Sequence, residues 1–149
     1  MKKYILLLLL LITNITIYAQ SYHTTKGYVY SHLLIQQVNG KTDFDEAAIG
    51  CIIFGTKGGK ELVGVSLDRE TIYQGYITKK EKGWESGSYL VSYEFTTYLH
   101  GISVPIVLSE IYDTPNSIIP KCFFLTVLNR YTKKPVRYNI FSGITKPQN

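Results

Sequence analysis

Residues 89–99 of this 149-residue chain read YLVSYEFTTYL. The odd positions are apolar or aromatic except for Thr97, whereas Ser, Glu and Thr fill most of the even positions. A period of two is typical of a strand with one face toward a core and the other at least partly wet. We therefore predict a β-strand over 89–99, with Tyr93 facing the core between Val91 and Phe95.

Similar strand patterns extend on both sides of this segment. Further strands are expected over 27–38, 48–55, 61–67, 71–79, 104–112, 121–129 and 136–141. Gly58 and Gly59 separate two of these runs and predict a hairpin turn, because both can adopt a positive φ. Pro105 favours an edge position or a strand start, since proline donates no ladder hydrogen bond. The run 121–129 is apolar on both faces, which favours a central strand.

Many short strands at hairpin spacing favour a single all-β domain over residues 20–149. We expect an antiparallel β-sandwich or a small β-barrel of about seven to nine strands. At most one short helix is expected, near residues 43–49, with Thr42 or Asp43 as its N-cap and Gly50 at its end. Residues 143–149 are expected to form a frayed tail.

A leader precedes this domain. Lys2 and Lys3 are followed by the apolar run 4–12 and then by a small residue, Ala19. This order is typical of a cleavable secretory signal peptide. We therefore predict a signal peptide over 1–19 and an exported protein, either periplasmic or extracellular. The apolar run is shorter than the roughly 20 residues of a membrane-spanning helix, which favours cleavage over a membrane anchor. No second long apolar segment follows in the sequence, so no span is expected after cleavage.

The basic residues favour few classes of partner. The formal net charge is +5, and two of the positive charges belong to the leader. The others do not form one dense stripe, so nucleic acid is not an expected partner. They gather at 79–82 and 130–137, which are interpreted first as solvated turns. The alternative is that these residues bind a polyanionic partner, such as an anionic glycan of a cell surface.

Cys51 and Cys122 each lie in an apolar run. Export permits a disulfide between them, and two buried free thiols are the alternative. Neither has a second Cys or a His at ligand spacing, and the acidic residues of 43–46 lack the other ligands of a calcium loop. We therefore expect no metal and no cofactor.

The aromatic residues are the remaining feature of the sequence that indicates a function. We find no G-x-S-x-G elbow and no H-E-x-x-H helix, so no catalytic residue is predicted. Exposed Tyr and Trp side chains on a β face stack against sugar rings or anchor a protein partner. We therefore expect a non-enzymatic binding module that recognises a glycan or a protein through Trp84, Tyr98, Glu94 and His100.

Two other functions are open. A small secreted hydrolase would use Glu94 or Glu110 as part of a carboxylate pair, together with His100. A structural or assembly subunit would pair with another chain through a β edge. The placement of the carboxylates and the charge of the edge strand distinguish these alternatives.

Overall fold

The computed structural model describes residues 22–30, 33–37, 42–46, 49–67, 71–128 and 134–140. Ten strands follow one another in them: β1 (His23–Tyr30), β2 (Leu33–Gln37), β3 (Thr42–Glu46), β4 (Gly50–Lys57), β5 (Lys60–Ser66), β6 (Ile72–Glu85), β7 (Ser88–Leu99), β8 (Ile102–Tyr112), β9 (Cys122–Leu128) and β10 (Pro135–Ile140). The predicted all-β class is confirmed, with slightly more strands than expected. The leader and the tail predicted over 1–19 and 143–149 lie outside the described residues.

The prediction of a helix near residues 43–49 is wrong for the residues that the structure describes. Thr42–Glu46 forms β3, which pairs antiparallel with β2. An acidic segment suits the first turn of a helix in isolation, but so short a helix is marginal by itself. The ladder with β2 supplies the backbone hydrogen bonds instead, so pairing decides the conformation.

The strands form one antiparallel sheet in the order β1-β4-β5-β6-β7-β8-β9-β10-β2-β3. β1 and β3 are its edges, and no pairing between described residues joins them, so the sheet is not closed into a barrel. β9 lies between β8 and β10, as its two apolar faces predict. Among the described residues, pairing of β8 with β9 begins at Ile106, next to Pro105.

The long central strands are joined by two-residue turns. Gly58-Gly59, Ser86-Gly87 and His100-Gly101 all have positive φ at both positions. This is the conformation of a type I′ turn, whose twist matches that of the strands it joins. The hairpin predicted at Gly58 and Gly59 is confirmed.

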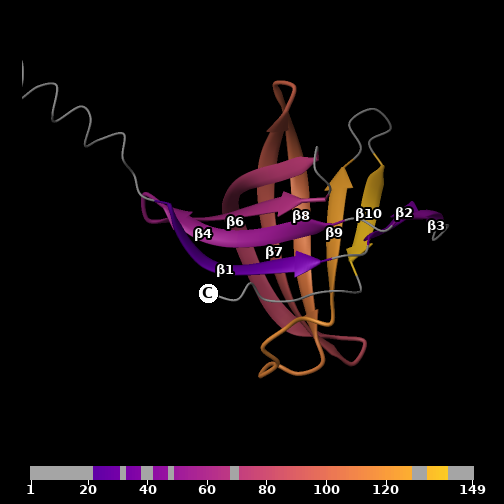
Figure 1. Ribbon diagram of the computed structural model, residues 1–149. Helices are drawn as coiled ribbons and strands as arrows, with labels where there is room; N and C mark the ends of the chain where they lie inside the picture. Colours follow the sequence, from indigo (N-terminus) through magenta and orange to yellow (C-terminus); the bar gives the residue numbers. More distant parts are fainter. Residues whose placement is uncertain are drawn as a thin grey trace, which may run out of the picture.

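Strand β6 carries the sheet from one layer into another. Up to Tyr76 it pairs with β5, and from Ile77 it pairs with β7, with a bulge between Ile77 and Lys79. A side chain at Gly75 would overlap the carbonyl oxygen of Thr96 on β7, so glycine permits this close crossing. The first layer contains β1, β4, β5 and the start of β6, and the second layer contains the rest. The layers pack face to face in a sandwich-like arrangement, with their strands crossing steeply (Figure 1).

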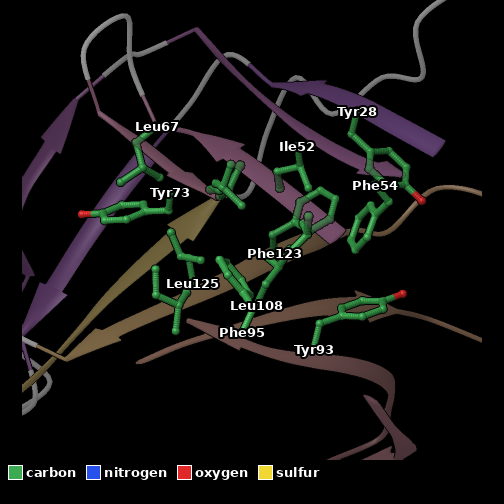
Figure 2. Packing of buried hydrophobic residues seen from close by; sticks show 14 of the residues in the cluster. Tyr28, Ile52, Phe54, Leu67, Tyr73, Tyr93, Phe95, Leu108, Phe123 and Leu125 are labelled. Atoms are coloured by element: carbon green, nitrogen blue, oxygen red, sulfur yellow. The ribbon is translucent and has the colours of Figure 1, made fainter. Parts of the chain in front are cut away.

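The core lies between the two layers and is built mainly from alternate residues of β1 and β4–β10 (Figure 2). Tyr93 and Phe95 of β7 are buried, as their period of two predicts. Across the layers, the ring centroids of Tyr28 and Phe123 are 5.2 Å apart, and those of Phe54 and Tyr93 are 4.7 Å apart. Burying one large apolar side chain contributes about 1.5–3 kcal/mol, so apolar packing is the main link between the layers.

The outward faces of the layers differ in chemistry. Two outward rows of cross-strand partners on the first layer are Val29, Cys51, Ser66 and Ile72, and Gly27, Ile53, Gly64 and Gln74. None of these residues is charged, and Val29, Ile53 and Ile72 are exposed. The outward face of the second layer is mixed, because it carries the hydroxyls of Ser92 and Ser109, which lie 2.8 Å apart, as well as the carboxylate of Glu94 and apolar side chains such as Val107. The lack of charge in these two rows therefore distinguishes the first layer.

Candidate functional site

A lysine and a glutamate meet between the two layers. Lys26 follows a β-bulge in β1 and lies opposite Phe54, with its side chain directed inward. Glu110 continues the inward row of Ile106 and Leu108 on β8, and its side chain is only 1% exposed. Lys26 Nζ lies 2.6 Å from each carboxylate oxygen. This ion pair therefore joins strands of opposite layers.

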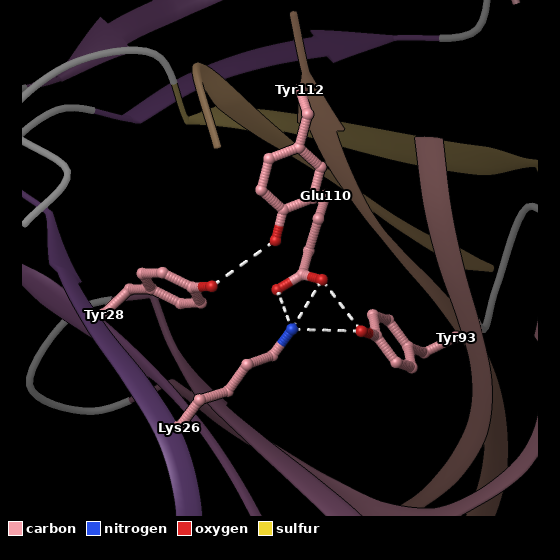
Figure 3. Close-up of polar contacts among 5 residues, drawn as sticks. All are labelled: Lys26, Tyr28, Tyr93, Glu110 and Tyr112. Atoms are coloured by element: carbon pink, nitrogen blue, oxygen red, sulfur yellow. Dashed lines mark hydrogen bonds and ion pairs between the residues drawn. The ribbon is translucent and has the colours of Figure 1, made fainter. Parts of the chain in front are cut away.

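Tyrosine hydroxyl groups surround the ion pair (Figure 3). Tyr93 donates a hydrogen bond of 2.8 Å to Glu110 Oε2 and accepts one of 3.1 Å from Lys26 Nζ. The hydroxyls of Tyr28 and Tyr112 lie 3.4 Å apart beside them. Glu110 Oε2 thus accepts hydrogen bonds from two groups, whereas Oε1 is held by charge alone because its contact with Lys26 lacks hydrogen-bond geometry.

These surroundings suit a structural ion pair. An isolated buried charge costs on the order of several kcal/mol, and Lys26 supplies the countercharge for Glu110. The same ammonium lies 4.3 Å from the centre of the Phe54 ring, a favourable cation–π contact. Burial first, and then the Glu110 carboxylate, raises the pKa of Tyr93. Its hydroxyl therefore stays protonated near neutral pH and is a hydrogen-bond donor, not a base.

The four residues predicted to bind a ligand are not brought together. Trp84 lies at the β6–β7 end of the long hairpins, where its ring meets that of Tyr89 edge-on at a centroid distance of 5.8 Å. Tyr98 and His100 lie at the opposite end of β7, at the turn into β8 (Figure 1). The extended strand from Tyr89 to Tyr98 spans about 30 Å. Trp84 and Tyr98 are both exposed, as predicted, by 62% and 76%.

Glu94 and His100 each have a local structural role. Glu94 lies on the outward face, 3.4 Å from Lys79 Nζ, which also lies 2.9 Å from Glu81. The two carboxylates, Glu81 first, raise the pKa of Lys79. His100 has a φ of 50° and forms the β7–β8 turn with Gly101. His is one of the residue types that tolerate this conformation.

The carboxylates considered for hydrolysis lie on opposite faces of the second layer. Glu94 points outward and is 46% exposed, whereas Glu110 points into the core. Glycoside hydrolysis needs two carboxyl groups that face one cleft, about 5–10 Å apart. The sheet itself separates Glu94 from Glu110, so the two do not form such a pair.

Cys51 and Cys122 are free thiols. Cys51 points outward from β4, opposite Val29, and Cys122 points outward from β9, opposite Ile111. The whole core therefore lies between them, and the disulfide considered from the sequence is not formed in this structure. Burial raises the pKa of the Cys122 thiol.

The end of the β6–β7 hairpin presents two faces. The inward side carries Trp84 together with Lys80 and Lys82. The other side carries a groove open to solvent, formed by Glu81, Gly83, Glu85, Leu90 and Ser92. Lys82 and Trp84 also line this groove, at the border between the two faces. Gly83 has no side chain, and no other atom lies within 4 Å of the position that a Cβ would take. Glycine at this position therefore leaves the groove wider.

No protein family, no curated protein and no solved structure matches this chain. No helix among the described residues is long and apolar enough to cross a membrane. The same residues contain no group of three or more His, Cys, Asp or Glu side chains able to hold a metal ion. Function is therefore inferred from the arrangement of the side chains.

The ion pair of Lys26 with Glu110 was not predicted from the sequence. Glu110 alternates with Ile106 and Leu108, and this pattern does indicate its inward direction. Lys26 precedes the predicted strand and carries no comparable signal. Its inward direction depends on the β1 bulge, which the residue pattern does not reveal.

Proposed function

We propose that the protein is a non-enzymatic binding module that recognises a glycan through the Trp84 end of the β6–β7 hairpin. The observation that carries this proposal is the exposed Trp84 ring resting edge-on against Tyr89. Tyr89 is partly buried and packs against the core, so it holds the indole in a fixed position. A rigid aromatic side chain presented in this way gives contact area to a ligand at a low cost in conformational entropy.

The state of the acidic residues supports binding over hydrolysis. Glu110 is buried and paired with Lys26, and Glu94 is engaged by Lys79 on the outward face. A general acid must reach the bond that it protonates, which a fully buried and paired carboxylate does not do. The accessible chemistry at the Trp84 end is stacking, hydrogen bonding and charge attraction.

The test is Trp84→Ala in the full chain, with Tyr98→Ala as the matched control, because each removes one exposed aromatic ring. The probe is a panel of immobilised oligosaccharides. We expect Trp84→Ala to weaken binding to the recognised members by about tenfold or more, equivalent to about 1.4 kcal/mol. Its thermal midpoint should stay near that of the parent, and Tyr98→Ala should bind normally. A large loss of thermal stability in Trp84→Ala, or binding unaffected by it, would refute the assignment.

A second function, self-association, is favoured by the outward face of the first layer. Val29, Ile53 and Ile72 are exposed there. In a two-fold pair a surface meets its own copy, so a charged residue near the axis faces a like charge. The two outward rows described above carry no charge, although the whole chain carries +5. A second copy of this chain is therefore the partner that we propose for this face.

Sedimentation analysis over a range of concentrations tests this second proposal. Ile53→Glu should keep the protein monomeric under conditions where the parent forms dimers. The control is Ser109→Glu, which adds the same charge to the outward face of the other layer. A parent that stays monomeric at its highest soluble concentration, or a control that dissociates equally, would exclude this interface.

A further inference from the structure

Strand alternation sorts residues 79–85 into two chemically different faces. Lys79 and Glu81 point outward with their cross-strand partners Glu94 and Ser92. Lys79 contacts the carboxylates of both Glu81 and Glu94, at 2.9 Å and 3.4 Å. The outward side therefore has no surplus positive charge.

The inward side of the same segment is different. Lys80, Lys82 and Trp84 are all exposed, and their cross-strand partners are Tyr93, Val91 and Tyr89. Lys80 Nζ lies 5.3 Å from the centre of the Tyr93 ring. Within the described part of the chain, neither Lys80 nor Lys82 forms an ion pair with a carboxylate. We name Lys80, Lys82, Trp84 and Tyr89 the basic aromatic strip.

Nearby acids do not cancel the charge of the strip. Glu110 and Glu61 both act electrostatically on the neighbouring Tyr93 hydroxyl. Glu110 is already neutralised by its contact with Lys26. Glu61 then leaves one negative charge on the side of the strip, against Lys80 and Lys82. Glu81 and Glu85 alternate to the other side of the hairpin, where Glu81 contacts Lys79. On its own side, the strip therefore keeps a positive surplus beside an exposed indole.

We infer that the basic aromatic strip selects acidic glycans, whose sugar rings carry carboxylate or sulfate groups. This inference rests on the proposed glycan-binding function and specifies its ligand class. Residues on one side of a strand recur about every 6.6–6.8 Å, so Lys80, Lys82 and Trp84 form a line of about 13 Å. Along this line the two ammonium groups attract anions, and the indole stacks on a ring. A linear acidic polysaccharide presents both features along one direction.

The experiment measures the binding of the full chain to heparin, polygalacturonate and uncharged dextran, and to vesicles that contain phosphatidylserine. The test variant is Lys80→Gln with Lys82→Gln. The matched control is Lys57→Gln with Lys60→Gln, which removes the same two charges from an exposed hairpin of the first layer. We expect the test variant to lose about tenfold in affinity for the acidic polymer that the parent binds, and the control to lose little. The parent should prefer an acidic polymer to dextran.

Each contrary result has a distinct meaning. Equal losses in the test and control variants would show attraction to net charge alone and would overturn the assignment to the strip. Binding to dextran that needs Trp84 but not the two lysines would leave the proposed function standing and overturn this inference. The absence of binding to all three polymers would overturn this inference, and the absence of binding to the oligosaccharide panel as well would overturn the proposed function. Binding only to vesicles that contain phosphatidylserine would assign the strip to a lipid surface and also overturn the inference.

Discussion

Lys26 Nζ and Glu110 Oε2 are in contact at 2.6 Å, although 84 positions separate the two residues in the chain. One residue comes from β1 and the other from β8, so the contact crosses from the first layer to the second. Apolar side chains allow small sliding movements, but a buried carboxylate is tolerated only next to its partner. The ion pair therefore fixes how the layers are placed on each other.

Removing one member of this pair should destabilise the fold strongly. Lys26→Met leaves the Glu110 carboxylate buried without a countercharge, so we expect a loss of about 3–5 kcal/mol in the free energy of unfolding. The double variant Lys26→Met with Glu110→Leu should recover most of that loss, because it removes both charges. Urea denaturation followed by circular dichroism measures both effects. A double variant no more stable than Lys26→Met would argue against the charge explanation.

Stability should decline at alkaline pH. The folded pKa values of Tyr28, Tyr93 and Tyr112 lie above the ordinary value of 10.0, chiefly because burial disfavours the phenolate. A raised folded pKa gives stability that is complete below pH 10.0 and is lost as the pH rises above it. Tyr112→Phe should reduce this decline. Urea midpoints between about pH 8 and 11.5 measure it, and an identical decline in Tyr112→Phe would contradict the assignment.

The close approach of β6 to β7 at Gly75 should make the stability of the fold sensitive to a single added methyl group. Gly75→Ala forces a side chain against the Thr96 carbonyl, and we expect a loss of about 1–3 kcal/mol in the free energy of unfolding. Gly64 is the matched control, because nothing lies within 4 Å of the place of its missing side chain. Gly64→Ala should be neutral or slightly stabilising. Chemical denaturation of both variants decides the point, and equal effects would exclude a clash.

The two thiols should differ in reactivity. Cys51 is partly exposed, whereas Cys122 is buried and its raised pKa reduces the thiolate fraction. Alkylation of the native protein with iodoacetamide should therefore label Cys51 first and Cys122 slowly. Peptide mass mapping identifies the labelled site. An intact mass lower by two hydrogens, with no labelling, would instead demonstrate a disulfide.

The fold class could be predicted because alternation is a local signal. The pattern of 89–99 correctly places Tyr93 and Phe95 in the core, and the Gly58-Gly59 pair correctly gives a hairpin. The expected helix failed at Thr42–Glu46, because its acidic residues satisfy the rules of a helix start while the partner strand β2 lies elsewhere in the chain. Cross-strand pairing is the information that a local pattern lacks.

The candidate site was predictable only in part. The exposure of Trp84 and Tyr98 follows from the pattern, and their separation follows from the length of the strand between Tyr89 and Tyr98. The outward pairing of Glu94 with Lys79 depends on the bulge in β6, which shifts the register by one residue. Such a shift changes the face of every later side chain, so the surface could not be assembled from residue types alone.

Strand β6 belongs to both layers, and it therefore couples the unfolding of one layer to the unfolding of the other. Neither layer can detach as a separate module, since the same backbone completes the hydrogen-bond ladder of each. The slowest-exchanging amides on the two sides of Ile77 should therefore become accessible in one common opening event. We therefore expect one cooperative unit with a single melting transition.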